Sequence, residues 1–414
     1  MAPIPESTKQ KVLLVALIAS VATIPLKNQL NSYAIIFFVA ACLIRRPLHE
    51  SARRLKSMRF WIVPVLYVMW AGCTYFWDTS GGYTLKELER YSILLFVPPA
   101  MALVPQISAA DIKKACMAFV AVTISVCLIC LFKSYSEYKV TGDYRVFYYH
   151  YLGEQMHLNA IFLSNYCLAS ITWILYFGFI QKKRRSYLDV ALIIAANLFL
   201  LLMILLLSSK LIIFLTLVIL IIFILFLGYI KGYFFRSLLI ISAIILAGVF
   251  AITKLPYLSW RINVTEVKMY KGEQDDQNGI AIRLFMWKNV GELISERPVL
   301  GHGLRGARVE TLNMYKEKNF ELGYNGNYHS HNQYLESWLM AGIPAIILLL
   351  GMMFTALWNG IKQKNFLLIL IAAHFMIQSL FESTFEVQHE LVFYIFFIFL
   401  FYYHAPHIRK PEHS

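Results

Sequence analysis

The sequence of 414 residues has few charged side chains: Asp, Glu, Lys and Arg make up only 15% of it, whereas 59% of its residues are hydrophobic. An average soluble domain carries about 25% charged residues. This shortage excludes an ordinary soluble globule. Long apolar runs occupy most of the chain, and a membrane-spanning helix needs about 20 consecutive apolar residues. The composition therefore predicts an all-α polytopic membrane protein.

The sequence also lacks the local motifs of nucleotide, metal and nucleic-acid chemistry. No GxxxxGKS or GxxxxGKT pattern occurs, so a phosphate-binding P-loop is excluded. The net charge of +14 comes from short basic clusters between apolar runs, a distribution typical of orientation signals and not of nucleic-acid binding. No cysteine lies in the long polar loop, which argues against a disulfide framework or a zinc site. We predict no metal and no cofactor. The six cysteines lie within or beside apolar runs: Cys42, Cys73, Cys116, Cys127, Cys130 and Cys167.

Twelve apolar segments are candidate spans. The run from about 187 to 230 is almost uninterrupted, and we divide it at the polar cluster Ser208–Lys210. No small-residue cleavage pattern follows the first apolar run, so we expect a retained first helix. The spans lie at about 11–26, 30–44, 60–77, 91–105, 112–132, 158–180, 187–207, 211–230, 237–253, 333–358, 365–381 and 391–404.

The distribution of Lys and Arg orients these spans. With the amino terminus inside, the inner segments carry 20 basic residues and the short outer loops only 7. Basic residues in short loops accumulate on the cytoplasmic side. We therefore predict an inner-membrane protein with both termini in the cytoplasm.

One long outer segment interrupts the apolar pattern and divides the chain. We predict transmembrane helices 1–9 in residues 1–253, a periplasmic loop in 254–332, and helices 10–12 with a short cytoplasmic tail in 333–414. Within the loop, Gly279–Arg297 has apolar residues at helical spacing, and Pro298 and Gly301 end the pattern. We expect a helical loop that lies on the membrane.

The end of this loop, Asn325–Ala345, contains two histidines and a carboxylate: His329, His331 and Glu336. Histidine exchanges protons near neutral pH, and an ionisable group at a membrane interface is a candidate functional group. Interfacial hydrogen bonding without chemistry explains these residues equally well.

Two cations are candidates for holding an anion. The planar guanidinium of Arg283 suits phosphate oxygens, although an arginine that reaches lipid head groups gives the same pattern. Lys210 stands alone at the tip of the hairpin, where it either lies in water or faces a cavity and an anion.

Two further polar groups lie on the outer face. Arg145, His150 and His157 precede the sixth span among tyrosines, which favours an interfacial aromatic belt. Glu382 and Glu386 follow span eleven, and their place in an outer loop explains their exposure. These two carboxylates could act as a base or bind a basic loop, and we assign them no catalytic role.

The outer face thus combines a histidine pair with cations near the membrane surface. A reaction that needs such cations, but neither ATP nor metal, is attack on a lipid-linked diphosphate. The diphosphate leaves, a base activates the acceptor hydroxyl, and arginine or lysine absorbs the developing charge.

Two motifs of the chain resemble those of the O-antigen ligase and polymerase superfamily. The first is His331-Asn332, nine residues, then Gly342–Pro344; the second is Arg283–Trp287 followed by the turn Pro298–Gly303. Their order and the loop between them are also similar to the family's. At motif level the resemblance covers roughly residues 190–345.

The resemblance implies a multi-span, GT-C-like glycosyltransferase of lipopolysaccharide biosynthesis. Such a ligase moves O-antigen from undecaprenyl diphosphate to the lipid A-core oligosaccharide at the periplasmic face. The resemblance assigns His331 as general base and Arg283 as diphosphate ligand. Family members commonly have a Ser-Arg pair where this chain has Ser209-Lys210, so Lys210 keeps the charge but loses the bidentate fork. The remaining expected contacts to diphosphate or sugar are His329, Arg145 and Tyr334.

Three alternatives differ in features that can be read from the chain. Polymerases of the same superfamily often have two large outer loops, whereas this chain has one, which favours the ligase. Oligosaccharyltransferases usually add a large carboxyl-terminal soluble domain. A lipid or saccharide transporter commonly has mid-span charges in two repeated halves, and here the polar residues gather on one face.

Overall fold

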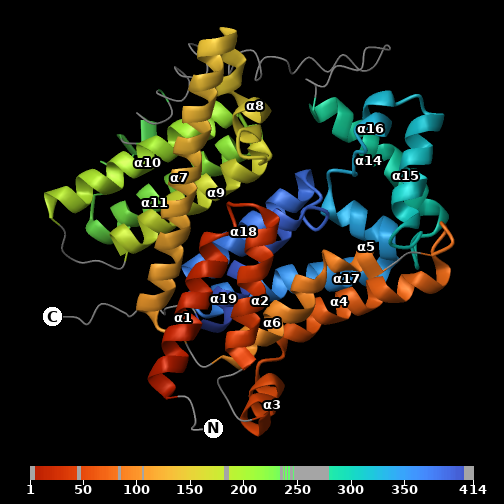
Figure 1. Ribbon diagram of the computed structural model, residues 1–414, viewed down its shortest axis with the longest axis horizontal. Coiled ribbons are helices and arrows are strands. Elements are labelled where there is room, and N and C mark those ends of the chain that lie inside the picture. Colours follow the sequence, from red (N-terminus) through yellow and green to blue (C-terminus); the bar gives the residue numbers. More distant parts are fainter. Residues whose placement is uncertain are drawn as a thin grey trace. The chain divides into compact units, whose positions relative to one another are not determined.

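The computed structural model describes residues 5–43, 48–82, 85–104, 107–180, 186–233, 236, 238–239, 241–242, 246 and 279–404. The described residues form helices joined by turns and short irregular segments, with no strand among them (Figure 1). The all-helical prediction is confirmed. Most of the predicted span 237–253 and the loop residues 254–278 lie outside the described residues.

Six helical segments in the described part are long and apolar enough to cross a membrane. The protein is therefore a multi-span membrane protein. Five other helices coincide with predicted spans but have only 12 to 17 residues: α1 (Glu6–Ala22), α2 (Asn28–Leu43), α6 (Ser92–Leu103), α18 (Phe366–Phe381) and α19 (Gln388–His404). These are shorter than the roughly 20 residues that a span needs, so the predicted total of twelve stays a prediction. The six segments are Arg59–Trp77, Ala109–Thr141, Ala160–Ile180, Tyr187–Leu207, Lys210–Tyr229 and Gln333–Lys362.

Contacts divide the chain into two compact units. The first unit joins both ends of the sequence: Met1–Ser20, Asn28–Ile112 and Val267–Ser414. Besides α6, α19 and most of α1, it contains α2 (Asn28–Leu43), α3 (Leu48–Ser57), η1 (Arg59–Trp61), α4 (Ile62–Cys73), η2 (Thr74–Trp77), α5 (Leu85–Glu89), α14 (Gly279–Glu296), α15 (Gly306–Glu317), α16 (Glu321–Asn325), α17 (Gln333–Lys362) and α18 (Phe366–Phe381).

The second unit consists of Val21–Lys27 and Lys113–Glu266. Its predicted hairpin is confirmed, because α10 ends at Leu207 and α11 begins at Lys210. Ser208 adopts a left-handed conformation with φ 49° and closes α10, as a C-terminal cap does. The helices are most of α7 (Ala109–Thr141), η3 (Tyr144–Phe147), α8 (Tyr149–Glu154), α9 (Ala160–Leu175), η4 (Tyr176–Ile180), α10 (Tyr187–Leu207) and α11 (Lys210–Lys231).

Helix α19 forms the core of the first unit. All its residues from Leu391 to Phe401 are buried. A helix that is apolar all round is a buried helix. The Phe396 ring lies 5.2 Å from that of Phe38 in α2, and the Phe399 ring lies 4.7 Å from that of Phe60 in η1. These ring pairs join the two ends of the chain.

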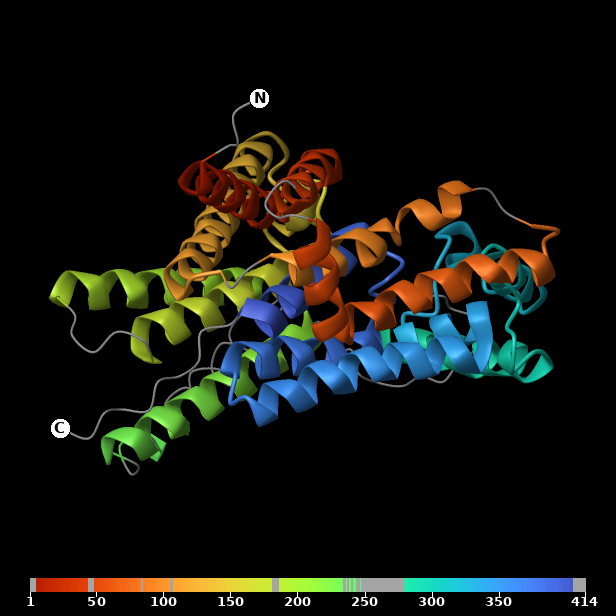
Figure 2. The same ribbon diagram turned by 90° about the horizontal axis from the view of Figure 1, so that it is seen from below.

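Helix α17 runs beside α4 in both views (Figures 1 and 2) and is kinked where the sequence has Gly-Ile-Pro. Pro344 has no N–H, so the Met340 carbonyl loses its helical donor. Gly342 has φ 68°, a conformation that favours glycine, and a Cβ there would overlap the Val299 carbonyl. The kink therefore needs both residues and leaves backbone carbonyls open.

The turn Pro298–Gly303 binds this kink. The N–H groups of His302 and Gly303 donate to the carbonyls of Leu339 and Met340 at 2.8 and 2.9 Å. A Cβ at Gly301 would lie 2.6 Å from the Met340 oxygen, so the turn requires glycine for this approach. The two sequence motifs are thus the two halves of one backbone junction.

Candidate functional site

The site is built around the segment between α16 and α17, which carries His329 and the signature histidine His331. Arg308 of α15 donates to the carbonyls of Asn327 and Tyr328, and the Trp287 indole donates to the Ser330 carbonyl at 3.1 Å. The Asn332 side chain accepts from the N–H groups of Tyr334 and Leu335, so it caps α17. The segment is therefore fixed from both sides.

His331 forms the first cluster, which we call the His331 cluster, with Glu382 and Arg283. Its Nδ1 lies 2.9 Å from Glu382 Oε2, and Arg283 donates to Glu382 Oε1 at 2.7 Å. The Nε of Arg283 also donates to the Phe381 carbonyl at 3.1 Å. A carboxylate only accepts, so Nδ1 of a neutral His331 carries the proton and Nε2 is left as the basic nitrogen. This is the geometry of a general base oriented by a carboxylate.

Glu382 stays ionised in this surrounding. Burial raises the pKa of its carboxyl, but His331 and Arg283 outweigh burial, so the pKa of Glu382 lies below its ordinary value. The Glu382 side chain is 10% exposed, whereas those of His331 and Arg283 are 31% and 25% exposed. The carboxylate is thus buried behind two groups that remain accessible.

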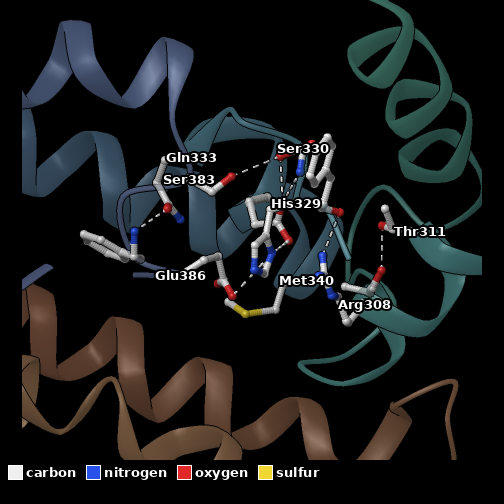
Figure 3. Close-up of polar contacts among 12 residues, drawn as sticks. Arg308, Thr311, His329, Ser330, Gln333, Met340, Ser383 and Glu386 are labelled. Carbon is white, nitrogen blue, oxygen red and sulfur yellow. Dashed lines mark hydrogen bonds and ion pairs between the residues drawn. The ribbon is translucent and has the colours of Figure 1, made fainter. Parts of the chain in front are cut away.

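His329 forms the second cluster, the His329 cluster, with Glu336, Glu386 and Arg90. Figure 3 shows its ring directed toward Glu386. Its Nδ1 lies 3.5 Å from Glu336 Oε1 and 3.8 Å from Glu386 Oε2, and it has no hydrogen-bond partner in the described structure. Both distances exceed those of hydrogen bonds. Arg90 pairs with Glu386 Oε2 at 2.6 Å, which leaves His329 as the loosely held member.

The ligand atoms of His329, Glu336 and Glu386 lie within 4.8 Å of one another, so these three residues are the candidate metal ligands of the described chain. Glu386 Oε2 already binds Arg90, and both Arg90 and Arg308 interact electrostatically with the two glutamates. If His329 is neutral, the positive charges of Arg90 and Arg308 equal the negative charges of Glu336 and Glu386. A divalent ion would leave a surplus of two positive charges in a partly buried place. The charges therefore disfavour a metal here.

Backbone and side-chain bonds tie both clusters to one frame, and Figure 3 shows the part of this frame around His329. The Ser330 hydroxyl and N–H donate to Glu336 Oε2 at 2.6 and 3.0 Å. Gln333 of α17 accepts from the Phe385 N–H at 2.6 Å, which anchors the loop between α18 and α19 that carries Glu382 and Glu386. The two glutamates and the two histidines thus face each other from neighbouring loops.

Three other residues were proposed from the sequence as substrate contacts: Tyr334, Lys210 and Arg145. The Tyr334 hydroxyl donates to the Met376 carbonyl at 2.9 Å, so it points into the helices and not to His331. Lys210 is the first residue of α11 and belongs to the second unit, as does Arg145. The Arg145 guanidinium binds Asp143 with contacts of 2.7 to 3.0 Å and holds the pKa of that carboxyl below its usual value.

The sequence analysis missed the contribution of Glu382 and Glu386 to the site. The expectation that both are exposed is wrong, because Glu382 is 7% exposed and the Glu386 side chain is 4% exposed. Of the two roles considered, binding a basic loop agrees with the Arg283 contact. One signal was available: the segment Glu382–Glu390 contains three glutamates and no Lys or Arg, so its charges need cations from other elements.

Comparisons with known proteins agree with this site only in part of the chain. Residues 195–350 match the family model described as O-antigen ligase, a family that ligases and polymerases share. This is less than half of the chain; it includes His331 and Arg283 but neither Glu382 nor Arg90. An uncharacterized protein of Haemophilus influenzae is 29% identical over 134 residues, or 31% of this chain.

The matched region covers 34% of that relative, so the chain spans about a third of the length of the protein it matches. The protein is thus an all-helical, multi-span membrane protein whose residues 195–350 are similar to the O-antigen ligase domain of ligases and polymerases.

Proposed function

We propose that the protein is an O-antigen ligase that transfers a polysaccharide from undecaprenyl diphosphate to the lipid A-core oligosaccharide. The observation that carries this proposal is the His331 cluster, in which one carboxylate binds both a histidine and an arginine. A base for the acceptor hydroxyl and a cation for the leaving diphosphate are the two groups that the reaction needs.

The reaction follows from the proton positions. Glu382 accepts from Nδ1 of His331, and Nε2 takes the proton of the acceptor hydroxyl. The hydroxyl oxygen then bonds to the anomeric carbon while the bond to the diphosphate oxygen breaks. Arg283 stabilises the charge that develops on the diphosphate. Neither a nucleotide nor a metal takes part in these steps.

The other proposed substrate contacts have smaller roles. We assign Lys210 and Arg145 to phosphate or sugar contacts, and Arg145 must first exchange Asp143 for the substrate. His329 contacts sugar or holds the segment that carries His331. Tyr334 is the least supported contact, since its hydroxyl is engaged by a backbone carbonyl.

The helix ends support a site at one membrane surface. Within the first unit, the residues of both clusters come from the ends of α6, α17, α18 and α19, from the loop before α17 and, for Arg283, from the first turns of α14. A transporter would need polar groups along a path through the bundle. We propose that this surface is periplasmic, in a bacterial inner-membrane protein with both termini in the cytoplasm.

A polymerase is the second candidate, because ligases and polymerases share the matched family. It would use the same base and cation with the end of a second lipid-linked chain as acceptor. The two enzymes differ only in the acceptor, so the product identifies which one this is.

Complementation tests the proposal. Cells that lack their ligase should regain a lipid A-linked polysaccharide ladder on a gel when they express this protein, and should lose it with His331→Ala or Arg283→Ala at equal membrane levels. Cells that lack their polymerase provide the second arm. Longer chains there, with polymer left on its lipid carrier in the first arm, would identify a polymerase and contradict the ligase.

A further inference from the structure

A cavity of the first unit lies beside the His329 cluster. Its volume is about 580 Å³, and it is lined by α2, α5, α6 and the start of α19. This volume lies within the range of about 300–1,000 Å³ that is typical of small-molecule sites. Arg90 links the two places, since it lines the cavity and pairs with Glu386.

The floor of the cavity is apolar. Ile35, Ile36 and Val39 share one face of α2, and Phe96 of α6 faces them. Ile36 and Phe96 are 66% and 57% exposed in the protein alone. From Ser32 to Val39 the helix rises about 10 Å at 1.5 Å per residue. The floor therefore suits the first part of one hydrocarbon chain.

The opposite end, which we call the mouth, is polar and carries both signs of charge. Lys86, Glu89 and Arg90 line it, together with Ser32 and Gln388, which hydrogen-bond each other at 3.0 Å. Lys86 and Glu89 are exposed and make no ion pair with the described residues. The Nε of Arg90 is buried without a hydrogen-bond partner in the described structure. The mouth thus offers donors for an anion and an acceptor for a cation.

Helices α2, α6 and α19 surround the cavity, and the mouth lies at one end of these helices. Ser32 bonds Gln388 near the start of α2 and α19, and Phe38 packs on Phe396 further along both. These two helices are therefore parallel, with the mouth at their amino-terminal ends. Arg90 lies two residues before the start of α6, at the same end.

We propose that the cavity binds one zwitterionic phospholipid with a primary amine in its head group, such as phosphatidylethanolamine. The phosphate lies between Lys86 and Arg90, the ammonium group meets Glu89, and one acyl chain follows the apolar floor. Charge complementarity selects this lipid: an anionic head group leaves Glu89 opposed to it, and a head group without phosphate leaves Lys86 without an anion.

Lipid retention measures this binding without any glycosyl transfer, so the result does not depend on the proposed function. The full chain is placed in nanodiscs of equal phosphatidylethanolamine and phosphatidylglycerol, extracted, and the retained lipids are counted by native mass spectrometry. We expect about one phosphatidylethanolamine per chain, at about tenfold preference over phosphatidylglycerol.

Three variants locate the lipid. Glu89→Gln removes the acceptor for the amine and should reduce the preference for phosphatidylethanolamine over phosphatidylglycerol to about one. Lys86→Ala should lower total lipid retention about tenfold. Ile36→Trp fills the floor and should abolish lipid retention. Glu154→Gln and Lys113→Ala, which do not line the cavity, are the matched controls. Equal retention of the two lipids by the unaltered protein, or an unchanged preference in Glu89→Gln, would overturn the proposal. Unchanged retention in Ile36→Trp, with the thermal midpoint preserved, would overturn it as well.

Discussion

Two histidines that are separated by one residue lie in different surroundings. His331 makes a hydrogen bond of 2.9 Å to a single carboxylate, which itself binds Arg283. His329 lies 3.5 and 3.8 Å from two carboxylates and bonds neither. A histidine pair in a sequence does not distinguish its two members; the contact with Glu382 fixes the tautomer of His331 alone, and this is why we propose His331 as the base.

The cations explain why the two clusters differ. Arg283 leaves one oxygen of Glu382 to His331, so histidine and arginine share the carboxylate. In the His329 cluster, Arg90 and the Tyr91 hydroxyl bind Glu386 at 2.6 and 2.7 Å, and both Glu386 oxygens are engaged. The first cluster can therefore orient a base, whereas the second holds loops together.

The largest difference is expected between the two histidine variants. His331→Ala removes the base, and general-base catalysis contributes about 10²–10⁴-fold, so we expect a loss of about 10³-fold in transfer rate. His329→Ala should lose about tenfold or less. The rate of ladder formation in vesicles with purified donor and acceptor measures both. Equal losses in the two variants would contradict the assignment of the base.

A smaller difference in transfer rate is expected between the variants of the two glutamates, Glu382 and Glu386. In Glu382→Gln the amide can donate to Nδ1 and favour the wrong tautomer of His331, so we expect a loss of about 10²-fold. Glu386→Gln keeps its shape and touches no base, and should lose about fivefold or less. A rate in Glu382→Gln close to that of the unaltered protein would show that His331 needs no orienting carboxylate.

Arg308 supports both histidines, so its loss should affect the whole segment. Arg308→Ala removes the donors to the carbonyls of Asn327 and Tyr328. A hydrogen bond to a charged group contributes about 1.5–3 kcal/mol, and we expect about a tenfold fall in rate as the segment loosens. Arg305→Ala is the matched control, because the hydrogen bonds of Arg305 within the described structure are made by its backbone, including an N–H bond to Asp78 at 2.9 Å. An equal effect of both variants would indicate a general loss of charge.

The pKa of Glu382 predicts how stability depends on pH. Its pKa is lowered in the folded protein, so its contribution is complete above the ordinary value of 4.5 and is lost as the pH falls through the lower folded value. The thermal midpoint of Glu382→Gln should lie about 2–4 °C below that of the unaltered protein at pH 7. Thermal unfolding from pH 7 to pH 3 should close this gap only below 4.5. A gap that closes at higher pH would mean a raised pKa.

The sequence predicted the structural features that depend on local apolar patterns and on glycine. Helix α14 and the break at Ser208–Lys210 agree with their patterns, because helical spacing and polar breaks are local signals. Composition did not determine the number of spans, because it does not distinguish a short span from a buried helix. Helix α6, for example, has only 12 residues.

The parts of the site that were missed depend on contacts distant in sequence. Glu382 meets His331 and Arg283 across 51 and 99 residues. No local pattern marks such a pair, and a carboxylate in an outer loop resembles any solvated residue. Arg283 was found because its helix and the turn after it carry a motif, whereas the loop between α18 and α19 carries none.

The smallest expected effect concerns metal. Chelation by EDTA should change the transfer rate less than about twofold, because Arg90 and Arg308 already balance Glu336 and Glu386. Arg90→Ala tests this charge argument directly: it frees Glu386 Oε2 and leaves one net negative charge beside His329. That variant should retain zinc after dialysis, measured by elemental analysis, whereas the unaltered protein should retain almost none. Stoichiometric zinc in the unaltered protein would make the His329 cluster a metal site and reverse the comparison between the two histidines.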